Sequence, residues 1–252
     1  MRYQHSDIDE ITTFLQDFGM SVAKRTDSEV WYRGYGEDQY VYYARKGPKQ
    51  YLGGTFQVAR RLPQAAEIQQ LSDAPGGGYL VRFSNPEGFP VNLIFGQRNL
   101  AFADFSFGPG PAGVHKLGHP GLCTTQLSKA NEPTSPSSHI NLGETYVDHY
   151  CFFINSNATS HLHHCSFEVH EFDTQKLGHQ WLAKKGYKPV WGVGRHILGP
   201  QIFYYWWDTT GNTIEHYADG DLVNDQTPVE YGPADDESLA VWGAEVPSWF
   251  FQ

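Results

Sequence analysis

The chain has 252 residues, 40% of them hydrophobic and 15% aromatic, enough apolar material for one sizeable core or two smaller ones. Its formal net charge of -10 at pH 7 leaves no basic stripe for a phosphate backbone, which argues against nucleic acid as a partner. No apolar run approaches the roughly 18 residues of a membrane span, and the opening MRYQHSDIDE lacks a basic and apolar signal segment. We therefore expect no membrane association and a cytoplasmic location.

The first predicted element is a helix over residues 6–19. Ser6 is expected to cap it and Gly19 to end it. Its apolar residues recur at spacings of three and four: Ile8, Ile11, Phe14, Leu15 and Phe18. Two aromatic stretches follow, EVWYRG and QYVYYA, and both are typical of strands.

An internal repeat organises the rest of the chain. TFQV at 55–58 resembles SFEV at 166–169. Each of these stretches leads into a segment with helical spacing, over 63–71 in the first copy and 173–185 in the second.

The repeat continues downstream as a predicted hairpin. In each copy a strand is followed by a turn residue, two further residues, a glycine and a second strand. The turn residue and the glycine are Asn85 and Gly88 in the first copy, Asp208 and Gly211 in the second. Each copy therefore reads as one strand, one helix and a hairpin.

Two less obvious units, residues 1–46 and 115–155, complete four modules in two pairs. The predicted fold is α+β, with paired βαβββ modules forming two cupped-sheet domains. Residues 127–139 are polar, contain two prolines and show no apolar period, so they read as loop. The third module is therefore predicted to lack its helix.

The predicted domains follow from this pairing. Residues 1–105 form an N-terminal domain without a metal site, and residues 114–222 form a C-terminal metal-binding domain. The linker between them is SFGPGPAG, residues 106–113. The tail, residues 223–252, is expected to dock on the body or on another subunit through its aromatic residues Trp242, Trp249, Phe250 and Phe251.

The two copies of the repeat provide an internal control. Where the second copy has His164 the first has Gly53, and where the second has Glu215 the first has Asn92. If the scaffold itself needed an imidazole and a carboxylate there, both copies would carry them. We infer that only the second copy carries the side chains of a functional site.

The predicted metal site combines both modules of the second pair. Strand alternation places His164, Ser166 and Glu168 on one face, and Glu215 on the last strand of the same module can reach that space. The opposing module supplies His119 in VHKLGHPGLC. Two imidazoles and one carboxylate with open positions suit non-haem Fe(II), with Mn(II) as the alternative.

A simpler interpretation exists for each of these residues. A single histidine on a strand is more often a hydrogen-bonded structural group than a ligand, and only the combination with Glu215 and His119 favours a metal. Tyr205 lies in a run of five aromatic residues and could be plain core. The remaining histidines of this region are expected at the surface or at caps: His161, His163, His170 and His179.

Three stretches carry a resemblance to a known family. These are KLGHPGLC, HHCSFEVHEFDTQKLGHQWL and GVGRHILGPQIFYYWWDTTGNTIEHYADGDL. Together with the paired modules they resemble the type I extradiol ring-cleavage dioxygenases of the vicinal oxygen chelate (glyoxalase/bleomycin resistance/dioxygenase) superfamily.

This resemblance implies a site and a reaction. The family's metal ligands fall on His119, His164 and Glu215. His196 and Tyr205 match positions that hydrogen-bond the substrate oxygens and assist proton transfer. The implied substrate is a catechol, the implied co-substrate is O2, and the implied metal is Fe(II).

The chain departs from the family pattern at one catalytic position. The stretch VDHYCFF resembles a family strand in which Asp is followed by two histidines, the second acting as acid and base. Here that second position is Tyr150, while alternation turns the other candidate, His149, away from the site unless the strand bulges. A phenol with a pKa of about 10 replaces an imidazole poorly at neutral pH.

Two further departures concern the scaffold. Pro120 removes a backbone donor directly after His119, and the third module lacks its expected helix. Three hypotheses therefore stay open: ring cleavage of a catechol-like compound, a non-oxidative isomerisation or cyclisation of an aromatic or polyketide-like compound on the same scaffold, and a metal-free binding protein. A homo-oligomer also stays open.

Overall fold

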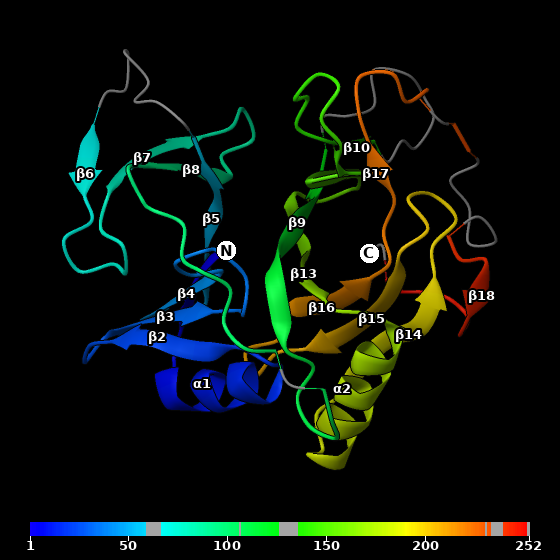
Figure 1. Cartoon of the computed structure of the whole chain (residues 1–252), viewed down its shortest axis with the longest axis horizontal. Helices are drawn as coiled ribbons and strands as arrows, with labels where there is room; N and C mark the ends of the chain where they lie inside the picture. The colour runs from blue at the N-terminus through cyan, green and yellow to red at the C-terminus, as the bar shows by residue number, and fades with distance from the viewer. Residues whose placement is uncertain (59–66, 106, 126–135, 230, 233–238, 251–252) are drawn as a thin grey trace. The chain divides into compact units, whose positions relative to one another are not determined.

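The computed structural model describes the chain over residues 1–58, 67–105, 107–125, 136–229, 231–232 and 239–250. The chain forms two compact units, the first made of residues 1–106 and 113–117, the second of residues 107–112 and 118–252. Each unit contains one eight-stranded sheet (Figure 1). Among the residues so described, no helix is long and apolar enough to cross a membrane.

The first unit is built from two modules. Its sheet has the order β2-β3-β4-β1-β5-β8-β7-β6, so the first strands of the two modules, β1 and β5, are neighbours at its centre. The elements are β1 (Arg2–His5), α1 (Ile8–Asp17), β2 (Ser21–Arg25), β3 (Glu29–Arg33), β4 (Tyr42–Lys46), β5 (Gln50–Gln57), β6 (Ile68–Gln70), β7 (Tyr79–Ser84) and β8 (Pro90–Phe95).

The second unit repeats this plan. Its sheet has the order β10-β12-β9-β13-β16-β15-β14-β18, and β11 and β17 form a separate pair. The elements are β9 (Val114–Thr124), β10 (Ser137–Ser138), β11 (Val147–Asp148), β12 (Phe152–Ser156), β13 (His161–Val169), α2 (Phe172–Lys184), β14 (Pro189–Arg195), β15 (Ile202–Trp207), β16 (Thr213–Ala218), β17 (Leu222–Val223) and β18 (Trp242–Gly243). The predicted α+β fold of paired modules in cupped sheets is confirmed.

The internal repeat is also confirmed, down to the strand register. In the first unit Thr55 on β5 pairs with Asn92 on β8 in a parallel ladder. In the second unit Ser166 on β13 pairs with Glu215 on β16 in the same way. A parallel register fixes which side chains are neighbours on a face, so equivalent positions in the two copies occupy equivalent places.

The hairpin turns of the two copies share one geometry. The Asn85 side-chain Oδ1 accepts hydrogen bonds from backbone amides two and four residues later, at 3.1 and 2.9 Å. Asp208 Oδ1 does the same at 2.8 and 2.8 Å. Gly88 and Gly211 follow with φ of 85° and 76°, a conformation that glycine adopts without strain.

The predicted first helix is correct in place but not in its cap. Helix α1 begins at Ile8, and the residue before it, Asp7, caps it instead of Ser6. Asp7 Oδ1 accepts from the amides of Asp9 and Glu10, each at 2.9 Å, and so satisfies two of the four free donors of the first turn. The apolar face is buried at Ile8, Ile11, Phe14 and Leu15.

Two predictions fall partly outside the described chain. The helix expected over 63–71 is wrong at its end, because β6 pairs antiparallel with β7 there. Its first part, 63–66, lies outside the described residues. The loop expected over 127–139 ends in β10, which pairs with β12. Residues 127–135 lie outside the described residues, so the prediction that the third module lacks its helix stays a prediction.

The tail docks on the second unit where it is described. Strand β18 pairs with β14 and extends the edge of the sheet. Trp249 stacks on Trp207 with ring centroids 5.5 Å apart. Phe250 is 7% exposed and belongs to a core cluster with Trp191, Phe203 and Tyr205. Phe251 lies outside the described residues, and Trp242 stays 44% exposed.

Candidate metal centre

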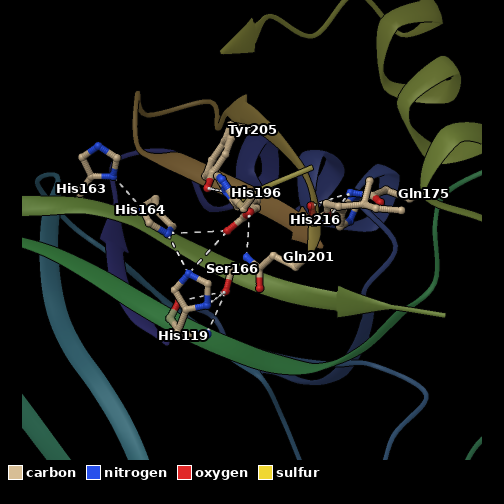
Figure 2. A network of polar contacts seen from close by, with 11 residues as sticks. His119, His163, His164, Ser166, Gln175, His196, Gln201, Tyr205 and His216 are labelled. Carbon is tan, nitrogen blue, oxygen red and sulfur yellow. Dashed lines mark hydrogen bonds and ion pairs between the residues drawn. The ribbon is translucent and has the colours of Figure 1, made fainter. Parts of the chain in front are cut away.

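The three predicted ligands converge in the second unit. His119 lies on β9, His164 on β13 and Glu215 on β16, and one ligand atom from each lies within 4.8 Å of the others. The two Nε2 atoms are 3.0 Å apart (Figure 2). Their distances to Glu215 Oε2 are 3.7 Å from His119 and 3.6 Å from His164. All three side chains are buried, at 3% exposure or less.

Two glycines beside His119 allow this close approach. A Cβ atom at Gly118 would lie 2.6 Å from Ser166 Oγ, and one at Gly121 would lie 2.5 Å from His164 Cε1. Any larger residue at either position would push against the side chains that line the site. Strand β9 can therefore present His119 at this depth because Gly118 and Gly121 lack side chains.

Ser166 holds the imidazole of His119 in place. Its Oγ lies 2.7 Å from His119 Nδ1 and 3.2 Å from the His119 carbonyl, and it accepts a hydrogen bond from the His119 amide at 2.9 Å. With the Nδ1 proton directed to Ser166, the Nε2 lone pair faces Glu215. We had not predicted a role for Ser166, although it lies two residues after His164 on the same face.

His163 performs the same task for His164. The two Nδ1 atoms lie 2.7 Å apart (Figure 2), and His163 Nε2 lies 2.7 Å from the Phe250 carbonyl. Because a carbonyl only accepts, His163 donates there and accepts from His164 Nδ1–H. The expectation that His163 lies at the surface is wrong. It is 8% exposed, because the tail covers it.

The electrostatics of the cluster favour a bound cation. Burial lowers the pKa of His119 and His164 well below 6.5, so both imidazoles are neutral, the form that binds metal. Burial also raises the pKa of Glu215, whose Oε2 is buried with no hydrogen-bond partner among the described residues. Two lone pairs and an unsatisfied carboxylate oxygen in one place are costly without a shared positive ion.

The distances fit a divalent metal ion. Two nitrogens that each lie about 2.1 Å from a metal are about 3.0 Å apart when they bind at right angles. The two Nε2 atoms show this separation. Two imidazoles and one carboxylate leave positions open on an octahedral ion, so the residues present fit Fe(II) or Mn(II).

Tyr205 and His196 extend the polar network from Glu215. Tyr205 on β15 pairs in register with Glu215, so the two side chains are cross-strand neighbours. His196 Nε2 lies 3.2 Å from the Tyr205 hydroxyl and His196 Nδ1 lies 2.9 Å from the Leu239 carbonyl. The structure therefore brings both predicted residues to the cluster, as Figure 2 shows. Gln201, which we had not predicted, donates to Glu215 Oε1 at 3.5 Å.

Tyr150 lies against the ligand His119. The two ring centroids are 4.3 Å apart, and burial raises the pKa of Tyr150 well above 10. The stretch VDHYCFF is interrupted, because β11 ends at Asp148 and β12 begins at Phe152. Tyr150 lies in this break, so strand alternation does not determine the direction of its side chain.

His149 lies in the same break but faces another part of the second unit. A Cβ atom placed on Gly199 would lie 2.7 Å from His149 Nδ1, so this imidazole packs against the loop after β14. Its ring meets Tyr150 edge-on at 5.6 Å. Of the predicted site residues on this stretch, Tyr150 is the one that contacts a ligand imidazole.

Comparison with known proteins gives the following results. No family model matches the chain. A segment of 126 residues, half of the chain, is 30% identical to Metapyrocatechase 2 of Cupriavidus necator, and the match spans 38% of that protein's length. Among solved structures, the Mn(II)-bound glyoxalase of Novosphingobium aromaticivorans is similar with a TM-score of 0.81 and 19% identity, over 98% of this chain and 90% of that one.

Two dioxygenase structures are equally similar. Homoprotocatechuate 2,3-dioxygenase of Arthrobacter globiformis has a TM-score of 0.82 and 15% identity, over 100% of this chain and 88% of that one. The Brevibacterium fuscum enzyme in complex with 3,4-dihydroxyphenylacetate has a TM-score of 0.81 and 16% identity, over 100% and 90%. The fold that the sequence resemblance predicted, that of the vicinal oxygen chelate superfamily, is confirmed.

Proposed function

We propose, from the vicinal oxygen chelate fold shared with glyoxalases and extradiol dioxygenases, that this chain is a metal-dependent extradiol-type dioxygenase acting on a catechol-like compound. The observation that carries the proposal is the buried convergence of His119, His164 and Glu215. The 30% identity of a 126-residue segment with Metapyrocatechase 2 supports the same reaction type. The substrates would be a small aromatic molecule with adjacent hydroxyl groups, and O2.

The metal would be held by His119 Nε2, His164 Nε2 and a Glu215 carboxylate oxygen. We propose Fe(II), with Mn(II) as the alternative that the Mn(II)-bound glyoxalase supports. When bound, such an ion orients the diol and passes electron density between the diol and O2. Ser166 and His163 would keep each imidazole in the tautomer that presents Nε2.

In this proposal Tyr205 and His196 position the substrate oxygens and handle a proton. Burial lowers the pKa of His196 to about 4, so the imidazole is neutral near pH 7. A neutral His196 that donates from Nδ1 to the Leu239 carbonyl has an acceptor at Nε2. The Tyr205 hydroxyl lies 3.2 Å from that acceptor, so it can pass a proton from a substrate hydroxyl group to His196.

Tyr150 supports a second candidate function. With its pKa raised by burial, the phenol stays protonated at neutral pH and cannot serve as a general base there. The same metal and scaffold would then catalyse a non-oxidative isomerisation or cyclisation of an aromatic or polyketide-like compound. This candidate differs from the first in needing no O2.

The deciding experiment starts from protein purified without air and loaded with Fe(II). Metal content is measured first, and O2 uptake is then followed with a panel of catechols while the absorbance of ring-opened product is recorded. Bound iron with O2 uptake is the expected result. Bound metal with no uptake for any catechol would reject the dioxygenase and favour the second candidate, while absence of metal binding would reject both.

A matched pair of variants tests the site itself. Glu215→Gln should lose the metal while keeping the shape of the side chain. Glu168→Gln is the control, because Glu168 lies on the same strand face as His164 but is hydrogen-bonded to the Tyr217 hydroxyl at 3.4 Å. Metal loss in both variants would mean that the ion binds through other residues.

A further inference from the structure

The first unit carries a row of basic side chains at the place where the second unit has its ligands. Arg2 on β1 pairs in register with Tyr43 on β4 and with Gly53 on β5. Two strands further along the sheet, Asn92 on β8 pairs with Arg82 on β7. These residues therefore lie across five adjacent strands, β4-β1-β5-β8-β7, of the first unit (Figure 1).

Two positions of this row correspond directly to positions of the metal centre. Asn92 occupies the place of Glu215, and Arg82, its partner across the hairpin, occupies the place of Tyr205. The Asn92 amide is fully used, because its Nδ2 donates to the carbonyls of Leu52 and Gly54 at 2.9 and 3.1 Å. Its Oδ1 accepts from Arg82 Nε at 3.0 Å. This row thus offers guanidinium donors where the other offers metal ligands.

Arg2 is a buried cation whose charge is not neutralised. It is 6% exposed, and its Nε and Nη1 atoms are buried with no hydrogen-bond partner in the described part of the chain. Its guanidinium carbon lies 3.9 Å above the centre of the Tyr43 ring. The Tyr40 hydroxyl also lies beside Arg2. This hydroxyl and the Tyr43 ring are both neutral, so they offset only part of the cost of burying a guanidinium group, and no described carboxylate balances its charge.

Other positive charges surround Arg2. The pKa of Arg82 is lowered by burial and by the positive charges of Arg2 and Arg45. Arg45 donates to the neutral Gln4 Oε1 at 3.0 and 2.6 Å, and the Glu29 carboxylate is engaged by the Tyr43 hydroxyl. None of the three arginines forms an ion pair with a described carboxylate, and residues 59–66 and 106 of this unit contain no acidic residue.

We propose that the cup of the first unit binds a small oxyanion, a carboxylate or a phosphate group, between Arg2 and Arg82. The fork of a guanidinium group matches either group with two parallel hydrogen bonds. Arg82 and Arg45 are exposed and so give an anion access from solvent, while Arg2 closes the inner end. This site is independent of the metal and of the function proposed for the second unit.

Isothermal titration calorimetry on the full chain tests the proposal with two probes, sodium benzoate and inorganic phosphate, at constant ionic strength in chloride. One site per chain is expected for at least one probe. Binding by benzoate alone would identify an organic carboxylate as the ligand class, and binding by phosphate alone a phosphate. Binding should persist in Glu215→Gln, which separates this site from the metal centre.

Two variants and one control locate the binding. Arg82→Gln should weaken the affinity at least about tenfold, because a charge-assisted hydrogen bond is lost; it is exposed and its loss leaves the fold intact. Arg2→Met should abolish binding. Arg25→Gln, which removes an exposed charge paired with Asp9 instead, should bind like the wild type. Absence of binding by both probes, or equal affinity in Arg82→Gln and the wild type, would overturn the proposal.

Discussion

The two cups share the order of their central strands and the register of their second modules but differ in chemistry. At matching positions the second has His164 and Glu215, while the first has Gly53 and Asn92. The second gathers neutral imidazoles and a carboxylate, and the first gathers guanidinium groups. A shared backbone therefore does not determine the ligand, and a few inward-facing side chains decide what each cup can hold.

The largest effect, on metal affinity, is expected when Glu215 of the second cup is replaced by asparagine, the residue that the first cup has at this position. Glu215→Asn should lower the affinity for Fe(II) or Mn(II) more than about 100-fold. Loss of a hydrogen-bond partner of a ligand typically lowers metal affinity about 10- to 100-fold, and loss of the ligand itself should lower it further. Competition with a metal-binding dye measures this. The reciprocal Asn92→Glu should gain no metal site. A gain there would show that the first cup lacks only a carboxylate.

The backbone of the first cup does not allow Gly53 to be replaced by histidine, the residue at the matching position of the second cup. This glycine has φ of 108°, and a Cβ atom would lie 2.4 Å from both the Pro90 carbonyl oxygen and Asn92 Nδ2. Gly53→Ala should lower the free energy of unfolding by about 2 kcal/mol or more, measured with urea. Gly108→Ala, where nothing lies within 4 Å, should be nearly neutral. Similar stability for both variants would contradict the strain argument.

The supporting histidine distinguishes the cups as well. His163 corresponds to Leu52 of the first copy, and His163→Leu removes the hydrogen bonds to His164 and to the Phe250 carbonyl. Metal affinity should fall about 10- to 100-fold, with circular dichroism unchanged. His161→Leu is the control, since its imidazole bonds only locally to Thr159. Unchanged affinity in His163→Leu would show that this relay does not orient the ligand.

The smallest effect concerns acid stability. The pKa of His196 is lowered to about 4 in the fold, against about 6.5 when unfolded. The unfolded chain therefore binds more protons between these values, and stability falls as the pH drops from 6.5 toward 4. His196→Gln should reduce this loss by about 1 kcal/mol at pH 5, allowing for partial exposure. If the stability of His196→Gln and of the wild type changed with pH at the same slope, the lowered pKa of His196 would be contradicted.

The sequence predicted those parts of the site that depend on local pattern and on the repeat. His164 and Glu215 stood out because the first copy lacks them, and the parallel registers carry both to one face. Helix α1 followed from its apolar spacing, but its cap did not, since Ser6 and Asp7 are both good caps. Which one acts depends on where the chain leaves β1.

The missed residues depend on contacts between distant segments. His163 reads as a surface residue until Phe250, 87 positions later, covers it. The break in the strand around Tyr150 depends on β11 pairing with β17 instead of continuing into β12. Nothing in the local pattern of hydrophobic residues predicts either event, because alternation describes one strand and not its neighbours.

The carbonyl groups of Leu239 and Phe250 each hold a histidine of the centre, His196 and His163 respectively. This segment follows all three ligands in the chain. A nascent chain would thus carry every ligand before the imidazoles are held in their final tautomers, so loading with a metal ion should be slow until residues 239–250 have been synthesised. Proteolytic removal of residues 239–250 would release both histidines without removing a ligand.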